Sequence, residues 1–93
     1  MGERGLDDLA GYRFLRGKLL GRLGRWEEAE AEILEETRRF PGYVPAWQTL
    51  VLLRASRGRG AEARKTVDEM VAAAEGPAAY AAAAELLERL GDA

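Results

Sequence analysis

The sequence predicts an all-α protein of about five helices, arranged as antiparallel pairs in a repeat array. First, the segment Gly24–Ala29 returns 34 residues later as Gly58–Ala63, with its Gly, Arg, Glu and Ala kept. Second, each copy lies between segments whose apolar residues recur at three- and four-residue spacing, the period of a helix. Third, no stretch alternates for long with the period of a strand, and Ala is abundant, which raises helix propensity. Each repeated segment is therefore expected to form a tight turn between two helices.

The first helix is expected from residue 6 to about residue 23, because Asp7 and Asp8 favour a helix start. Glycine inside a helix lowers the stability of the helix relative to alanine, so at least one of the three glycines in this segment is expected to be there because it permits close helix packing. The glycines are Gly11, Gly17 and Gly21. The expected buried stripe is Tyr12, Leu15, Leu19, Leu20 and Leu23.

The second helix is expected over residues 26–39, with acidic residues at its start and Arg38 and Arg39 at its end, where each complements the helix dipole. Its expected buried face is Trp26, Ala29, Ile33, Thr37 and Phe40. The third helix is expected from Pro45 to about residue 57, since proline suits the first turn. Its expected buried residues are Trp47, Leu50, Val51 and either Leu53 or Arg54.

A fourth helix is expected over residues 61–74 and a fifth over residues 78–90, separated by Gly76-Pro77. The expected buried residues of the fourth are Ala63, Val67, Met70, Val71 and Ala74. Those of the fifth are Tyr80, Ala83, Ala84, Leu87 and Leu90.

Composition excludes several kinds of function. The chain has no Cys and no His, so the commonest nucleophiles, general bases and transition-metal ligands are missing. We expect no enzyme, no cofactor and no metal site. The net charge of −2 argues against nucleic acid as a partner, and no apolar run is long enough to span a membrane. We therefore expect a cytoplasmic protein, with residues 1–5 disordered and residues 6–93 as one domain.

The 34-residue period and the turn residues resemble the tetratricopeptide repeat (TPR) family. Matching residues in the first unit are Gly17, Ala29, Ile33 and Pro41. Those in the second unit are Trp47, Leu50, Ala63 and Val67. Those in the third are Tyr80, Ala83, Ala84 and Leu87, at a 33-residue step. Residues that depart from the family pattern are Arg13, Arg16, Glu36, Val51 and Arg54. The resemblance implies repeat one at 10–43, repeat two at 44–77, a partial repeat or capping helix at 78–93, and a right-handed superhelix.

The resemblance also implies a concave groove, lined by the first helix of each pair, that holds a peptide or helix of a partner protein. The groove residues are expected to be Phe14, Lys18, Arg22, Gln48, Thr49, Leu52, Ser56 and Arg89, together with Ala81 and Glu85. Lys18 and Arg22 lie one helical turn apart and can address one carboxylate, so an acidic partner is one option. Ordinary solvated side chains are the alternative for these charges, and a core or inter-repeat position is favoured for Trp26 and Trp47.

Three alternatives stay open at this stage. The chain could be an unrelated helix bundle with a chance internal echo. It could be a structural or self-association module of a larger protein, forming a homo-oligomer through its end helices, which exposed apolar residues at both ends would favour. Nucleic-acid binding through the basic run from Arg13 to Arg25 is the least favoured, because acidic residues follow that run.

Overall fold

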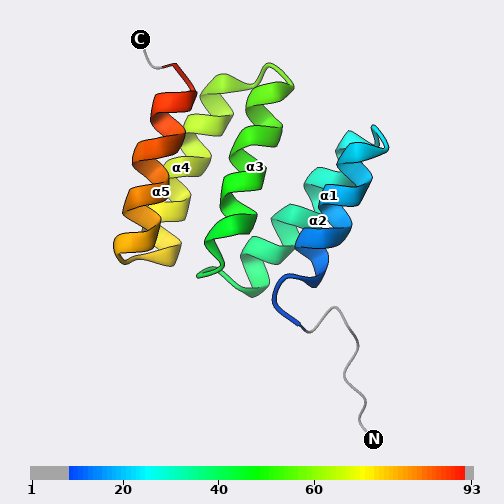
Figure 1. Ribbon diagram of the computed structural model, residues 1–93, viewed down its shortest axis with the longest axis horizontal. Coiled ribbons are helices and arrows are strands. Elements are labelled where there is room, and N and C mark those ends of the chain that lie inside the picture. Colours follow the sequence, from blue (N-terminus) through cyan, green and yellow to red (C-terminus); the bar gives the residue numbers. More distant parts are fainter. Residues whose placement is uncertain (1–8, 92–93) are drawn as a thin grey trace, which may run out of the picture.

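The computed structural model describes residues 9–91, and within them it contains five helices and no strand (Figure 1). The helices are α1 (Tyr12–Arg22), α2 (Trp26–Arg39), α3 (Val44–Ser56), α4 (Gly60–Ala74) and α5 (Pro77–Arg89). The predicted all-α class is thus confirmed. The expected disorder of residues 1–5 and the expected helix start at residue 6 lie outside the described residues. Residues 9–11 form a turn rather than a helix, and Gly11 has a left-handed φ of 96°.

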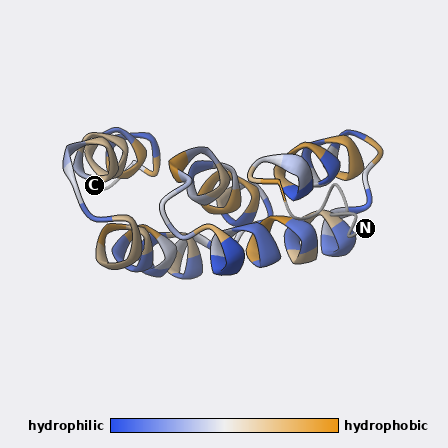
Figure 2. Ribbon diagram, turned by 90° about the horizontal axis from the view of Figure 1, so that it is seen from below, coloured by the Kyte–Doolittle hydropathy of each residue, from blue (hydrophilic) through white to orange (hydrophobic). Residues whose placement is uncertain are grey.

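The helices form two rows, with α1, α3 and α5 in one and α2 and α4 in the other (Figure 2). Each helix packs on the next along the chain, and α3 also packs directly on α5. The pair α1–α2 and the helix α5 consequently lie at opposite ends of the array (Figure 1).

The two repeated turns have the same geometry. Gly24 and Gly58 have φ values of 79° and 81°, a conformation that an L side chain rarely adopts. The next residue then donates its backbone N–H to a carbonyl five residues back, from Arg25 to Leu20 and from Arg59 to Arg54, both at 2.9 Å. This pattern is the Schellman ending of a helix. The sequence echo therefore corresponds to a real structural repeat of the turn.

The predicted buried stripe of α1 is wrong for three leucines. Leu15 and Leu19 are each 60% exposed and Leu23 is 69% exposed, while Gly17 is buried. The reason is the close approach of α2, since a β-carbon at position 17 would lie only 2.4 Å from Ile33 Cδ1. A row of leucines on this face would hold the two helices apart, so α1 turns its glycine face inward.

The predicted face of α5 is also wrong, by one residue. Tyr80 is 61% exposed, Leu87 is 38% exposed and Ala84 is exposed. The buried side chains are Ala79, Ala82, Ala83 and Leu86. They follow Trp47, Leu50, Val51 and Arg54 at a step of 32 residues rather than 33. Small alanines let α5 approach α4 and α3 closely, which leaves no room for Tyr80 on that side.

The predicted cores of α2, α3 and α4 agree with the structure at most positions, although Trp26, Phe40, Val71 and Ala74 are only half-buried. Buried residues that were expected include Ala29, Ile33, Thr37, Trp47, Leu50, Val51, Ala63, Val67 and Met70. One cluster joins α3, α4 and α5 around Trp47, whose indole Nε1 donates to the carbonyl of Pro41 at 2.8 Å. A second, smaller cluster joins Ile33, Ala46 and Leu50, with Phe14, Leu34 and Tyr43 packed against it.

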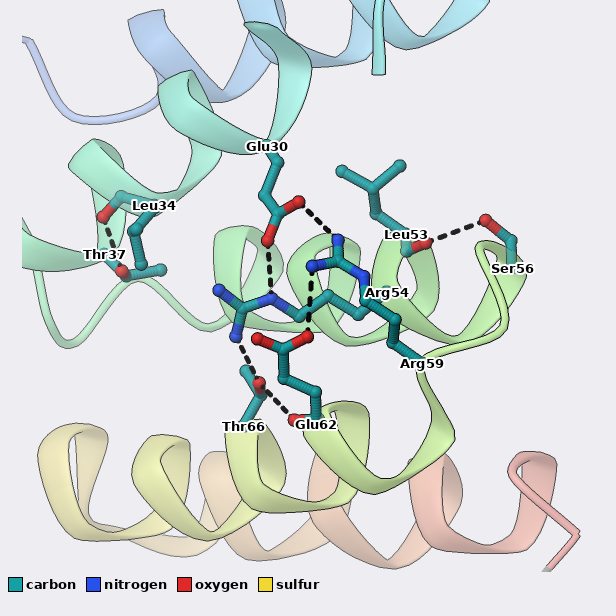
Figure 3. A network of polar contacts seen from close by, with 9 residues as sticks. All are labelled: Glu30, Leu34, Thr37, Leu53, Arg54, Ser56, Arg59, Glu62 and Thr66. Atoms are coloured by element: carbon teal, nitrogen blue, oxygen red, sulfur yellow. Dashed lines mark hydrogen bonds and ion pairs between the residues drawn. The ribbon is translucent and has the colours of Figure 1, made fainter. Parts of the chain in front are cut away.

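A polar network connects α2, α3 and α4, as Figure 3 shows. The Glu30 carboxylate accepts hydrogen bonds from Arg54 Nε at 2.8 Å and from Arg59. Arg54 also donates to the hydroxyl of Thr66 at 2.6 Å, and Thr66 donates to the carbonyl of Glu62 at 2.8 Å. The Arg54 side chain is only 11% exposed. The hydrogen bonds of this network satisfy its guanidinium group, which allows a charged residue at this nearly buried position.

Burial alone would raise the pKa of Glu30, but hydrogen bonds from Arg59 and Arg54 and their positive charges outweigh it and hold the pKa below its ordinary value. Glu30 therefore stays ionised in the folded protein at neutral pH, and the network keeps its charge pairing.

Candidate interaction groove

A cleft of about 420 Å³ lies between α1 and α3. Its lining is mainly apolar, and α2 contributes the central part of it. The lining residues are Gly17, Lys18, Gly21, Arg22, Trp26, Ala29, Ile33, Thr49, Leu52, Leu53 and Ser56.

The two α1 glycines have different parts in this cleft. Gly17 is the point of closest packing between α1 and α2, where no side chain fits against Ile33. Gly21 has space above it, since a β-carbon there would meet only Trp26, at an ordinary contact distance of 3.7 Å. The absence of a side chain at Gly21 therefore keeps this part of the cleft open and uncovers the Trp26 ring.

The charged residues of the cleft are both basic. Lys18 and Arg22 are exposed on α1, one helical turn apart, and no acidic side chain lines the cleft. Neither forms an ion pair with any residue between 9 and 91. Lys18 Nζ instead lies 5.1 Å from the centroid of the Phe14 ring, which steadies it beside the cleft. The cleft thus combines an apolar interior with an uncompensated positive rim.

The other basic residues of α1 are used structurally. Arg13 contacts Glu32 at 3.2 Å and Arg16 lies 3.7 Å from the same carboxylate. The opposite charges of α1 and α2 therefore neutralise each other in part. Lys18 and Arg22 are the exception on this helix.

A second, smaller cleft of about 260 Å³ lies further along the same row of helices. It is lined by Phe14, Pro45, Gln48, Thr49, Leu52, Glu85, Leu86 and Arg89. Thr49 and Leu52 line both clefts, so the two adjoin along α3. We call the two clefts together the groove.

The structure places nine of the ten expected groove residues in the lining of this groove, and Ala81 is the exception. Lys18, Arg22 and Ser56 line the larger cleft, while Phe14, Gln48 and Arg89 line the smaller one. Glu85 also lines the smaller cleft, whereas Ala81 lines neither. Phe14 also packs against the smaller core cluster, where its ring meets that of Tyr43 edge-on with the two ring centroids 5.5 Å apart.

Sequence reasoning missed eight groove residues, namely Gly17, Gly21, Trp26, Ala29, Ile33 and Leu53 in the larger cleft and Pro45 and Leu86 in the smaller one. Trp26 was assigned to the core, but it is only half-buried and has the guanidinium of Arg57 at 5.2 Å from its ring centroid. The available signal was the spacing of Gly17 and Gly21, which clears one face of α1 next to the tryptophan that begins α2.

Comparisons with protein-family models, with curated proteins and with solved structures found no match. In the part of the chain that the structure describes, no helix is long and apolar enough to cross a membrane. Residues 9–91 also contain no group of three or more His, Cys, Asp or Glu side chains that could hold a metal ion.

Proposed function

We propose that this chain is a protein-interaction module of the tetratricopeptide type, in which helix pairs form a right-handed superhelical array and the groove binds a segment of another protein. The observation that carries the proposal is the larger cleft, whose apolar interior is open to solvent and whose only charged residues are Lys18 and Arg22. The equivalence of the Gly24 and Gly58 turns supports the repeat architecture.

The chemistry of the cleft indicates what kind of segment fits. Trp26, Leu52 and Leu53 offer apolar contact for a bulky aliphatic or aromatic side chain, which gains free energy by leaving water. Lys18 and Arg22 offer charge-assisted hydrogen bonds to a carboxylate next to that side chain. The favoured ligand is therefore a peptide segment with an apolar anchor beside an acidic residue.

Peptide selection on the purified protein tests the proposal without knowledge of the natural partner. Random peptides displayed on phage are selected against the immobilised wild type and sequenced. The expected consensus contains a bulky apolar residue within a few positions of Asp or Glu. A consensus without any acidic position, or no enrichment over uncoated support, contradicts the proposal.

Trp26 supplies a direct readout of where a selected peptide binds. The chain has two tryptophans, so a Trp47→Phe background leaves Trp26 as the only one. A peptide that enters the larger cleft is expected to shift the emission maximum of Trp26 to shorter wavelength, because the ring loses water. Titration that leaves the emission unchanged places binding outside the cleft.

A further inference from the structure

Both ends of the array expose apolar side chains that no described residue covers. At one end, Leu15, Leu19 and Leu23 of α1 are 60–69% exposed; we call them the leucine face. At the other end, Tyr80 is 61% exposed and Leu87 38% exposed, with the exposed Ala84 between them on α5; we call these the tyrosine face. Each set recurs at three- or four-residue spacing and so forms one stripe on its helix.

Stacked helix repeats ordinarily end in polar outer faces, because each apolar end surface would otherwise remain in water. Single exposed apolar residues are common, but stripes of this kind on both end helices of one small domain indicate contact surfaces. The question is what covers them.

Charge selects the occupant. Residues 12–25 contain five basic side chains and no acidic one, namely Arg13, Arg16, Lys18, Arg22 and Arg25. Glu32 and Glu28 of α2 pair with Arg13, Arg16 and Arg25, so the uncompensated positive charges of α1 are Lys18 and Arg22. At the other end, α5 and the turn before it contain three acidic side chains, Glu75, Glu85 and Glu88, against one basic side chain, Arg89. Two leucine faces placed together would bring like charges together, and so would two tyrosine faces. A leucine face against a tyrosine face brings opposite charges together.

We propose that the leucine face of one copy of this chain docks on the tyrosine face of a second copy, so that the protein associates head to tail. Such a contact is heterologous, and each added copy still presents one free face of each kind. Unless the rotation closes a ring, association therefore continues into open chains. The apolar residues of the two faces line neither cleft of the groove, although Lys18 and Arg22, the charges beside the leucine face, do. The docking does not require a bound peptide.

Sedimentation velocity with two complementary variants tests this arrangement. Leu15→Glu/Leu19→Glu places acids on the leucine face, where they oppose Glu88. Tyr80→Lys/Leu87→Lys places bases on the tyrosine face, where they oppose Arg16. All four positions are at least 38% exposed, so both variants should keep the fold, which circular dichroism melts check. Ala31→Glu and Ala72→Lys, at exposed positions on α2 and α4, serve as charge controls.

The wild type and both controls are expected to gain mass with concentration, starting from the 10.2 kDa monomer. Each variant alone should stay monomeric. An equimolar mixture should form a heterodimer, because one intact leucine face meets one intact tyrosine face. Association should also weaken as salt rises.

Two results overturn the proposal. The first is a wild type that stays monomeric up to about 1 mM, the scale of very weak association. The second is a Tyr80→Lys/Leu87→Lys variant that still dimerises and forms no heterodimer on mixing, which would mean that two leucine faces pair with each other.

Discussion

Gly17 of α1 lies directly against Ile33 of α2. A β-carbon at position 17 would sit 2.4 Å from Ile33 Cδ1 and 3.2 Å from the backbone oxygen of Ala29. Ile33 is fully buried. This contact sets how close the two helices come, which face of α1 turns inward and, with Gly21, the shape of the cleft.

Gly17→Ala is therefore expected to destabilise the protein by about 1–3 kcal/mol through overpacking, even though alanine favours helix. Gly21→Ala is the matched control on the same helix, because its β-carbon meets Trp26 at an ordinary 3.7 Å. It is expected to stabilise by up to about 1 kcal/mol. Urea unfolding followed by circular dichroism measures both. Equal effects of the two substitutions would show that α1 and α2 are not packed through Gly17.

Trp47→Ala is expected to lower the free energy of unfolding by about 3–5 kcal/mol, because it leaves a cavity among α3, α4 and α5. Trp47 is 7% exposed and loses its hydrogen bond to Pro41 as well. Trp47→Phe keeps most of the packing and is expected to cost less than half as much. If the alanine variant melts like the wild type, Trp47 is not a core residue.

Glu36 stabilises the start of α1 from a distance. Its side chain is fully buried, and one carboxylate oxygen accepts the backbone N–H of Gly11, the residue before the helix. Glu36→Ala leaves this N–H without its partner and is expected to cost about 1–3 kcal/mol. Glu36→Gln keeps an oxygen acceptor of similar shape and should cost less. Thermal melts compare the two, and equal losses would remove the capping role.

The Glu30 network predicts a dependence of stability on pH. Its pKa is lowered in the fold, so the stabilisation is fully present above the unfolded-state pKa and is lost as pH falls through the folded-state value. The stability difference between wild type and Glu30→Gln is therefore expected to be constant near neutral pH and to shrink below about pH 4.3, the ordinary value for glutamate. Urea titrations from acid to neutral pH measure it. A difference independent of pH would mean that Glu30 is not paired in the fold.

The extent to which sequence predicts this structure depends on how distinct the faces of each helix are. α2 and α4 have one apolar face among charged residues, so Ile33, Val67 and Met70 were placed correctly. α1 has a leucine stripe and a glycine stripe, and periodicity alone favoured the leucines over Gly17. α5 is rich in alanine on several faces, so its apolar pattern does not define one buried face. The large side chain of Tyr80 was therefore predicted to be buried, whereas the structure buries the small Ala79.

The groove was expected from the resemblance to a helix-pair repeat family, which implied that Lys18, Arg22 and Leu52 lie on helices of one row. The role of Trp26 could not be predicted in this way, because it lies on α2. It lines the cleft beside Gly21, which carries no side chain that could cover it. Register predicts which helix faces align, but steric fit between two helices decides which side chains stay open to solvent.

The binding constant of a selected peptide, measured by isothermal titration, tests the groove most directly. The Lys18→Glu/Arg22→Glu variant is compared with Arg38→Glu/Lys65→Glu, which makes the same charge change at exposed positions on α2 and α4. The groove account predicts that the first variant weakens binding by about tenfold or more, while the second stays within about twofold of wild type. Equal weakening by both variants, or none by the first, would contradict it.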